Sequence, residues 1–152
     1  MTYECELVEQ TARPTLVVRT RGRMDRLPQV LGPAWGQIMA YAGKAGEAPT
    51  GPPFVAYHDM DMQNLDLEIG LPFAQALDGE GDVRPASLPA GTAVETVHVG
   101  PYDHIGDAYE ALQAWLQEHG REPAGAPYEH YLNDPDEVPP GELRTRIVWP
   151  VA

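Results

Sequence analysis

The last ten residues of this chain repeat a segment from its middle. Residues 143–152 (LRTRIVWPVA) align with residues 65–74 (LDLEIGLPFA), and leucine, isoleucine, proline and alanine recur in place at a separation of 78 residues. Gly22 matches Gly100 at the same separation. A sequence that repeats itself builds one structural unit twice, so this feature constrains the fold more than any other.

Each half of the repeat has the pattern of strand, helix, strand and strand. In the first half we predict strands at residues 15–20, 51–59 and 65–73 and a helix at 27–42. In the second half we predict strands at 93–99, 125–135 and 143–151 and a helix at 103–119. Two such units predict an α+β domain with a mostly antiparallel sheet and two helices. We expect one domain over 1–152, with repeat one at about 13–74 and repeat two at about 91–152.

Apolar residues at helical spacing carry the two helix predictions. The first stripe is Leu27, Val30, Leu31, Ala34, Trp35, Ile38, Met39 and Ala42. The second stripe is Ile105, Ala108, Tyr109, Leu112, Trp115, Leu116 and His119. We expect Asp25 to cap the first helix, Gly43 and Gly46 to end it, and Gly120 to end the second. Residues 3–8 form a further predicted strand, and residues 74–89 are predicted to be a linker.

The charge of the chain excludes several classes of partner. A net charge of −13 argues against direct binding of nucleic acid or an anionic membrane, because both require a basic surface. The single cysteine, Cys5, permits no intramolecular disulfide and is expected to pack, which favours a cytoplasmic location. The N-terminus has no signal-peptide pattern and no segment is apolar enough to cross a membrane. The five histidines have no metal-ligand spacing, so we expect no metal and no cofactor.

An acid lies among aromatic residues in the predicted strand 125–135. Strand alternation places Glu129 and Tyr131 on one face and His130 on the other. The residue of the first repeat that matches Glu129 is Val55, so the fold does not require a charge there. This pattern is unusual for a core and suits a ligand pocket, and the alternative is a satisfied acid on an edge strand.

Charges also alternate on the last strand of each repeat. The first repeat has Asp66 and Glu68 where the second has Arg144 and Arg146. These charges pair if the equivalent strands approach each other across the two-fold, and otherwise they form a solvated sheet face.

Five segments give the chain a resemblance to a known family. They are VGPY at 99–102, AWL at 114–116, GAPYEHYLNDP at 125–135, LRTRIVWPV at 143–151 and LEIGLP at 67–72. With these segments the chain resembles the GyrI-like (gyrase-inhibitor-like) family of small-molecule-binding domains. Related domains are the effector-binding halves of multidrug-sensing AraC-type and MerR-type transcription regulators.

The resemblance implies tandem strand-helix-strand-strand repeats with a central groove between them. It also implies that Glu129 matches the glutamate of the family's cationic-drug pocket. Some family members look like hydrolases that open the cyclopropane rings of alkylating natural products with an aromatic residue and this glutamate. The chain has no helix-turn-helix segment, so we expect a stand-alone effector domain without direct transcriptional control.

The predicted ligand-binding residues combine one central acid with aromatic walls. They are Glu129, Tyr131, Tyr57, Trp149, Tyr102, Tyr109 and Glu68. In a binding protein Glu129 attracts a lipophilic cation that stacks on the rings. In a hydrolase Glu129 is the general base and Tyr131 or Tyr57 orients the ligand. Tyr109 lies in the apolar stripe of its helix, so a core position is the alternative for it, and we expect Trp35 and Trp115 to be core residues.

Three hypotheses about function therefore stay open. The first is a stand-alone protein that senses or sequesters lipophilic, cationic or aromatic small molecules. The second is the cyclopropane-opening hydrolase. The third is an acidic protein-interaction module that inhibits a DNA topoisomerase by mimicking nucleic acid.

Overall fold

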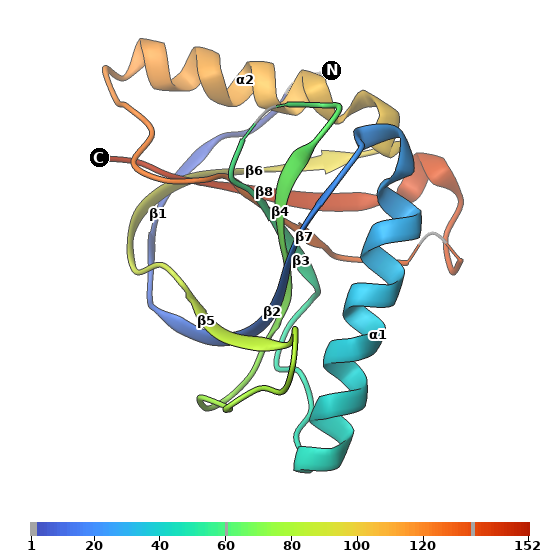
Figure 1. Ribbon diagram of the computed structural model, residues 1–152. Coiled ribbons are helices and arrows are strands. Elements are labelled where there is room, and N and C mark those ends of the chain that lie inside the picture. The colour runs from blue at the N-terminus through green and yellow to red at the C-terminus, as the bar shows by residue number, and fades with distance from the viewer. Residues whose placement is uncertain (1–2, 60, 135) are drawn as a thin grey trace. The chain divides into compact units, whose positions relative to one another are not determined.

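The computed structural model describes residues 3–59, 61–134 and 136–152, and the described chain forms two compact units. The first-repeat unit is Thr11–Ala90, and the second-repeat unit combines Met1–Gln10 with Gly91–Ala152. Each unit contains one α-helix and an antiparallel sheet (Figure 1).

The first-repeat unit follows the predicted order of elements and adds one strand. Its elements are β2 (Arg13–Gly22), the 3₁₀ turn η1 (Met24–Arg26), α1 (Leu27–Ala45), β3 (Phe54–Tyr57), β4 (Leu65–Pro72) and β5 (Arg84–Leu88). Its strands pair in the order β5-β2-β4-β3, all antiparallel. The helix α1 packs on β2 and β4.

The second-repeat unit has the same plan. Its elements are β1 (Glu6–Gln10), β6 (Gly91–Val99), the 3₁₀ turn η2 (Tyr102–His104), α2 (Ile105–Glu118), β7 (Tyr128–Tyr131), the 3₁₀ turn η3 (Pro140–Glu142) and β8 (Arg144–Pro150). Its strands pair in the order β1-β6-β8-β7, all antiparallel. The helix α2 runs along β6 and β8 (Figure 1).

The two units match element by element. β2, η1 and α1 of the first begin 78 residues before β6, η2 and α2 of the second, and β3 and β7 match at a separation of 74. Equivalent positions also keep equivalent register, because Val55 pairs with Ile69 as Glu129 pairs with Ile147. The predicted α+β class and the strand-helix-strand-strand repeat are therefore confirmed.

The interpretation of residues 74–89 as a linker is wrong. They contain β5, which pairs with β2 along Arg13–Val17 at the outer edge of the first-repeat sheet. Most of its residues are exposed, so it lacks the alternation of apolar and polar residues that marks a half-buried strand. The strand β1 has the same place at the outer edge of β6 in the second-repeat unit.

Both helices bury the central residues of the predicted stripes, but Met39 of the first stripe is 47% exposed and the helix ends need corrections. The buried residues are Leu27, Leu31, Ala34, Ile38 and Ala42 in α1 and Ile105, Ala108, Leu112 and Leu116 in α2. Asp25 is not the N-cap of α1, because the turn η1 precedes the helix and Arg26 takes that position. Gly46 caps the C-terminus of α1 with a φ of 71°, in the left-handed region that favours glycine. His119 is exposed and stacks on the ring of Trp115.

The core of the second-repeat unit lies between α2 and its sheet. Val94, Ile147 and Val151 pack against the buried face of α2, and Cys5 packs at the margin of this cluster. Burial raises the pKa of the Cys5 thiol, which keeps it protonated near neutral pH and suits a packing residue. No helix among the described residues is both long and apolar enough to span a membrane.

The sheet of the first-repeat unit has one apolar and one charged face. In β4, Leu65, Leu67 and Ile69 are buried, and Asp66 and Glu68 alternate with them on the opposite face. On that face two arginines of β2 lie beside the acids, since Arg19 pairs in register with Glu68 and Arg21 with Asp66. The predicted half-buried strand is confirmed.

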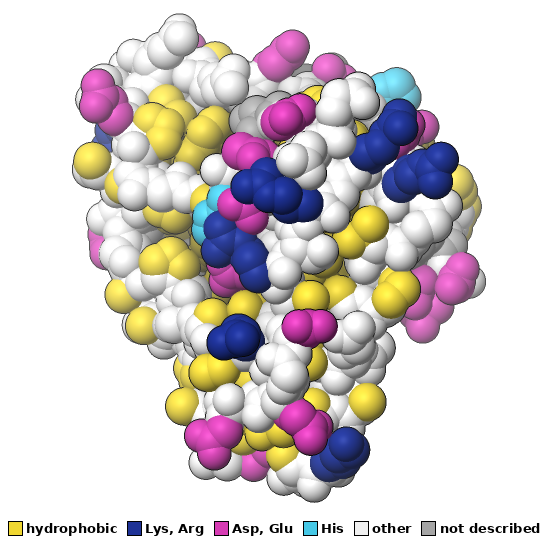
Figure 2. All heavy atoms as spheres, viewed as in Figure 1, with side chains coloured by type: hydrophobic (Ala, Val, Ile, Leu, Met, Phe, Trp, Pro, Cys, Tyr) yellow, Lys and Arg dark blue, Asp and Glu magenta, His cyan; other side chains and the backbone are white. Residues whose placement is uncertain are grey.

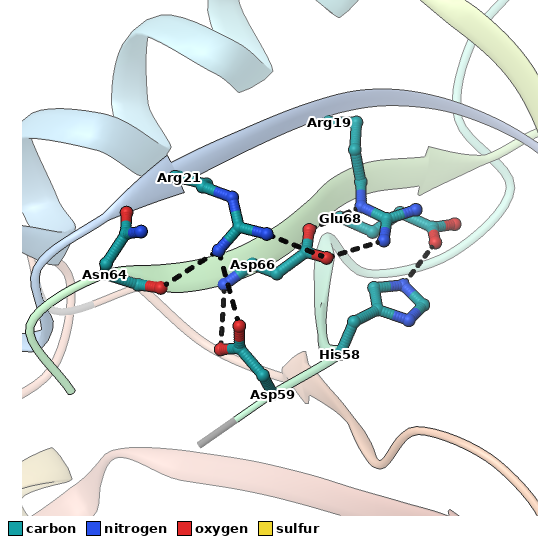
Figure 3. Close-up of polar contacts among 7 residues, drawn as sticks. All are labelled: Arg19, Arg21, His58, Asp59, Asn64, Asp66 and Glu68. Atoms are coloured by element: carbon teal, nitrogen blue, oxygen red, sulfur yellow. Dashed lines mark hydrogen bonds and ion pairs between the residues drawn. The ribbon is translucent and has the colours of Figure 1, made fainter. Parts of the chain in front are cut away.

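The charged groups on this face bind one another (Figure 3). Arg19 donates two hydrogen bonds to Asp66, at 2.7 and 2.9 Å, and Arg21 lies 3.4 Å from Asp59. His58 lies 2.8 Å from Glu68. Asp66 and Glu68 thus have partners inside their own unit. Space-filling atoms show Lys and Arg interspersed with Asp and Glu on the face drawn in Figure 2.

We predict that replacing Asp66 by Asn makes stability less dependent on acid pH. Hydrogen bonds from Arg19 hold the pKa of the Asp66 carboxyl below its ordinary value. The ion pair therefore stabilises the fold fully above the unfolded-state pKa of about 4, and this contribution disappears as pH falls through the lower folded-state pKa. Because Arg19 is 52% exposed, D66N should lower the free energy of unfolding by only about 0.2–1 kcal/mol at pH 7.

Urea unfolding of both proteins at pH 7 and at about pH 2–3 measures the difference, which should shrink at the lower pH. Glu80→Gln is the control, because Glu80 and Lys44 form an exposed pair with a separation of 3.5 Å. If the difference in unfolding free energy between the wild type and D66N stays constant with pH, the proposed contribution of the Arg19–Asp66 ion pair is wrong.

Candidate functional site

Glu129 is a buried acid in strand β7 (Tyr128–Tyr131) of the second-repeat unit. Only 1% of this residue is exposed to solvent. It pairs in register with Ile147, which belongs to the cluster that α2 covers, so both side chains lie on the helix side of the sheet. The equivalent residue of the first-repeat unit, Val55, is 0% exposed. The repeat thus builds the same buried position once with an alkyl group and once with a carboxylate.

Three tyrosine hydroxyls donate hydrogen bonds to this carboxylate. Tyr102 donates to Oε1 at 2.6 Å and Tyr131 donates to the same oxygen at 2.9 Å. Tyr109 donates to Oε2 at 2.5 Å. Both oxygens therefore accept short hydrogen bonds, which compensate in part for the loss of water.

Each tyrosine reaches the acid from a different element. Tyr102 is the first residue of the 3₁₀ turn η2, and Tyr109 lies in the helix α2 that follows this turn. Tyr131 lies two residues beyond Glu129 on the same strand face, as the predicted alternation requires. The hydroxyls converge because η2 and α2 lie over the face of the sheet that carries Glu129.

The aromatic rings pack against one another in pairs around the acid. The ring centroids of Tyr102 and Tyr131 are 6.1 Å apart at 56°, and those of Tyr109 and Trp149 are 6.1 Å apart at 73°. All four rings are partly exposed, whereas Glu129 is buried. A molecule that approached this cluster would meet aromatic surface first and the carboxylate behind it.

The first-repeat unit lacks most of this cluster. Its residues at the positions of Tyr102, Tyr109 and Trp149 are Met24, Leu31 and Leu71. Only Tyr131 has an equivalent tyrosine, Tyr57. The charge and two of its three hydroxyl donors therefore occur together in one unit, although the common fold tolerates apolar residues at all of these positions.

Five of the seven predicted site residues come together in the second-repeat unit: Glu129, Tyr102, Tyr109, Tyr131 and Trp149. The other two belong to the first-repeat unit. Tyr57 is buried in β3 opposite Leu67, and Glu68 binds His58. A role for Tyr57 and Glu68 in ligand binding stays a prediction.

Sequence reasoning missed His98, which contacts the segment that carries Tyr102. It is 2% exposed at the end of β6, and its Nε2 lies 2.9 Å from the carbonyl oxygen of Pro101. The alternation of Val94, Thr96 and His98 on the inward face of β6 was the available signal. A search for metal-ligand spacing does not detect a histidine of this kind.

Comparison with known proteins decides the family. A family model described as the GyrI-like small molecule binding domain matches residues 3–152. The chain belongs to this family. The resemblance carried by the sequence motifs is thereby confirmed, and so is small-molecule binding as the general property of the domain. A search of curated proteins returned no match.

Among solved structures, EcmrR contains a domain that is similar to this chain. The C-terminal domain of EcmrR superposes with a TM-score of 0.89 at 27% identity, covering 100% of this chain and 99% of that domain. EcmrR in its complex with DNA gives a TM-score of 0.86 at 27% identity, covering 98% of this chain. This chain spans 57% of that EcmrR chain.

A more distant structure contains a ligand. SAV2435 bound to tetraphenylphosphonium superposes with a TM-score of 0.58 at 11% identity, covering 98% of this chain and 95% of SAV2435. At this identity the likeness shows the GyrI-like fold alone.

We predict that Tyr109→Phe destabilises the domain through the carboxylate. The variant keeps the ring that packs on Trp149 but removes the donor to Glu129 Oε2. Loss of a donor from a buried carboxylate should reduce the free energy of unfolding by about 1–3 kcal/mol, measured by urea denaturation.

Glu129→Val provides the matched background, since Val55 occupies the equivalent position in the first repeat. Without the carboxylate, the Y109F substitution should lower the free energy of unfolding much less in the E129V background than in the wild type. An equal loss of unfolding free energy in the two backgrounds would contradict the role of this hydrogen bond.

Proposed function

We propose that this domain binds lipophilic cations at Glu129 and the surrounding aromatic rings, as a sensor or sequestering protein. The observation that carries the proposal is a carboxylate, 1% exposed, to which three tyrosine hydroxyls donate hydrogen bonds. The equivalent position in the other repeat is Val55, so maintaining the fold does not account for the charge.

The hydroxyl groups stabilise the carboxylate without neutralising it. Moving an ionised acid out of water costs several kcal/mol, and hydrogen bonds return only part of that free energy. Tyrosine hydroxyls are neutral donors, so these three hydrogen bonds place no positive charge beside the carboxylate. A cation bound nearby would interact with the carboxylate in a medium of lower dielectric than water.

The geometry around the acid favours one kind of cation. The carboxylate already accepts three hydrogen bonds at its roughly four acceptor positions, so few remain for N–H donors of a ligand. The partly exposed rings of Tyr102, Tyr131 and Trp149 offer faces for cation–π contact, worth about 0.5–2 kcal/mol each. A bulky cation with delocalised charge and apolar substituents fits these features better than a primary amine does.

Two solved structures support different parts of the proposal, SAV2435 the kind of ligand and EcmrR the role. SAV2435 was solved with tetraphenylphosphonium, a cation of this chemistry. EcmrR, whose C-terminal domain matches along its whole length, was solved on DNA, which associates this type of domain with regulation. The hydrolase hypothesis uses the same acid as a general base, and it predicts chemical change of the ligand rather than reversible binding.

Calorimetric titration with tetraphenylphosphonium tests the proposal, with triphenylphosphine oxide as a neutral aryl compound for comparison. We expect the wild type to bind the cation and not the neutral compound. Glu129→Gln keeps the size of the side chain but removes its charge, and should weaken binding by about ten- to a hundredfold.

Glu95→Gln is the matched control, because Glu95 is a partly exposed acid in β6 opposite Val148, on the face of the sheet away from Ile147. It should bind like the wild type. Equal losses in E95Q and E129Q would show a general effect of net charge, and unchanged binding in E129Q would remove the proposed role of the acid. Mass spectrometry of the recovered ligand separates binding from hydrolysis.

A further inference from the structure

His98 contacts the backbone of the turn that carries Tyr102, one of the three tyrosines that bind Glu129. Its Nε2 lies 2.9 Å from the carbonyl oxygen of Pro101, the residue immediately before Tyr102. Its Nδ1 lies 2.8 Å from the hydroxyl of Tyr3. The imidazole is 2% exposed, so both contacts are made in the interior of the second-repeat unit.

The two partners select the tautomer of the neutral ring. A carbonyl oxygen can only accept, so Nε2 carries the hydrogen that is donated to Pro101. In the neutral ring Nδ1 is then an acceptor, and the hydroxyl of Tyr3 donates to it. The burial of His98 and the paired geometry select one tautomer and one ring orientation.

We propose that His98 is a positioning residue for the Glu129 site, because it fixes the turn from which Tyr102 reaches the carboxylate. This inference rests on the proposed function of that site. The turn leaves β6 through Gly100, whose φ of 129° is a conformation that favours glycine and whose N–H donates to the carbonyl of Leu143. The Pro101 carbonyl also accepts from the N–H of His104, so the imidazole completes the clamp on this peptide group.

The first repeat supports the assignment by contrast. Its residue at the position of His98 is Thr20, and its residue at the position of Tyr102 is Met24. The first repeat therefore lacks both the tyrosine that binds the acid and the histidine that contacts its turn. The histidine thus accompanies the tyrosine that it positions, whereas the surrounding turn and helix occur in both units.

Two substitutions separate the two contacts of the imidazole. His98→Gln places an amide N–H near the position of Nε2 and preserves a donor for Pro101. His98→Asn reaches only the position of Nδ1, so it preserves a partner for Tyr3 and loses the contact with Pro101. Titration with tetraphenylphosphonium should show affinity within about twofold of the wild type for H98Q and a loss of about tenfold for H98N.

A double-mutant cycle with Tyr102→Phe distinguishes positioning from a general structural role. If His98 acts through the Tyr102 hydroxyl, H98N adds no further loss of affinity in the Y102F background. Tyr3→Phe removes only the other contact of the imidazole, so its affinity should lie, like that of H98Q, within about twofold of the wild type. Losses that multiply in the double variant, or wild-type affinity in H98N, would overturn the proposal.

The proposal remains testable if H98N does not fold or if the wild type does not bind the cation. If H98N does not fold, H98Q decides the question, because wild-type affinity supports the proposal and a tenfold loss contradicts it. If the wild type binds no cation, the proposed function fails and the crystal structure of H98N still tests His98. The distance from Tyr102 Oη to Glu129 Oε1, 2.6 Å in the wild type, should then exceed hydrogen-bonding range, and an unchanged distance would refute the positioning role.

Discussion

The hydrogen bonds between the tyrosines and Glu129 are the interaction on which the candidate site depends. A carboxylate inside a protein needs donors, and here they come from η2, α2 and β7. The site therefore requires the turn, the helix and the strand to keep their places relative to one another within this unit. The same requirement explains why a buried histidine beside Pro101 matters to an acid that it does not touch.

Duplication separates what the fold needs from what the site needs. Both units use the same sequence of elements and the same register, and both bury apolar side chains beneath one helix. The first unit has Val55, Met24 and Leu31 where the second has an acid and two tyrosines. Polar groups at equivalent positions of matching elements support the proposed binding site in the second unit, since burial of a charge opposes stability.

Much of this arrangement was predictable from the sequence. The repeat located the strands and helices, and the contrast with Val55 made Glu129 conspicuous. The strand β5 escaped prediction because a short, exposed edge strand has no amphipathic pattern. The turn η1 displaced the expected cap at Asp25, because helix ends depend on backbone geometry that composition does not specify.

The sequence grouped Tyr102, Tyr109 and Tyr131 with Glu129, but the hydrogen bonds of all three hydroxyls to its carboxylate were beyond sequence analysis for a different reason. It depends on how η2 and α2 pack over β7, and side-chain directions across elements follow from packing rather than from spacing along the chain. The contact of His98 with a backbone carbonyl likewise depends on the path of the turn through Gly100. Such contacts leave no periodic signal in the sequence.

The most direct test of the account is a crystal structure of the domain grown with tetraphenylphosphonium. The account predicts the cation against the rings of Tyr102, Tyr131 and Trp149, with Glu129 as the nearest acid and its tyrosine hydrogen bonds preserved. A cation bound on the charged face of β4, with the rings around Glu129 unoccupied, would contradict it.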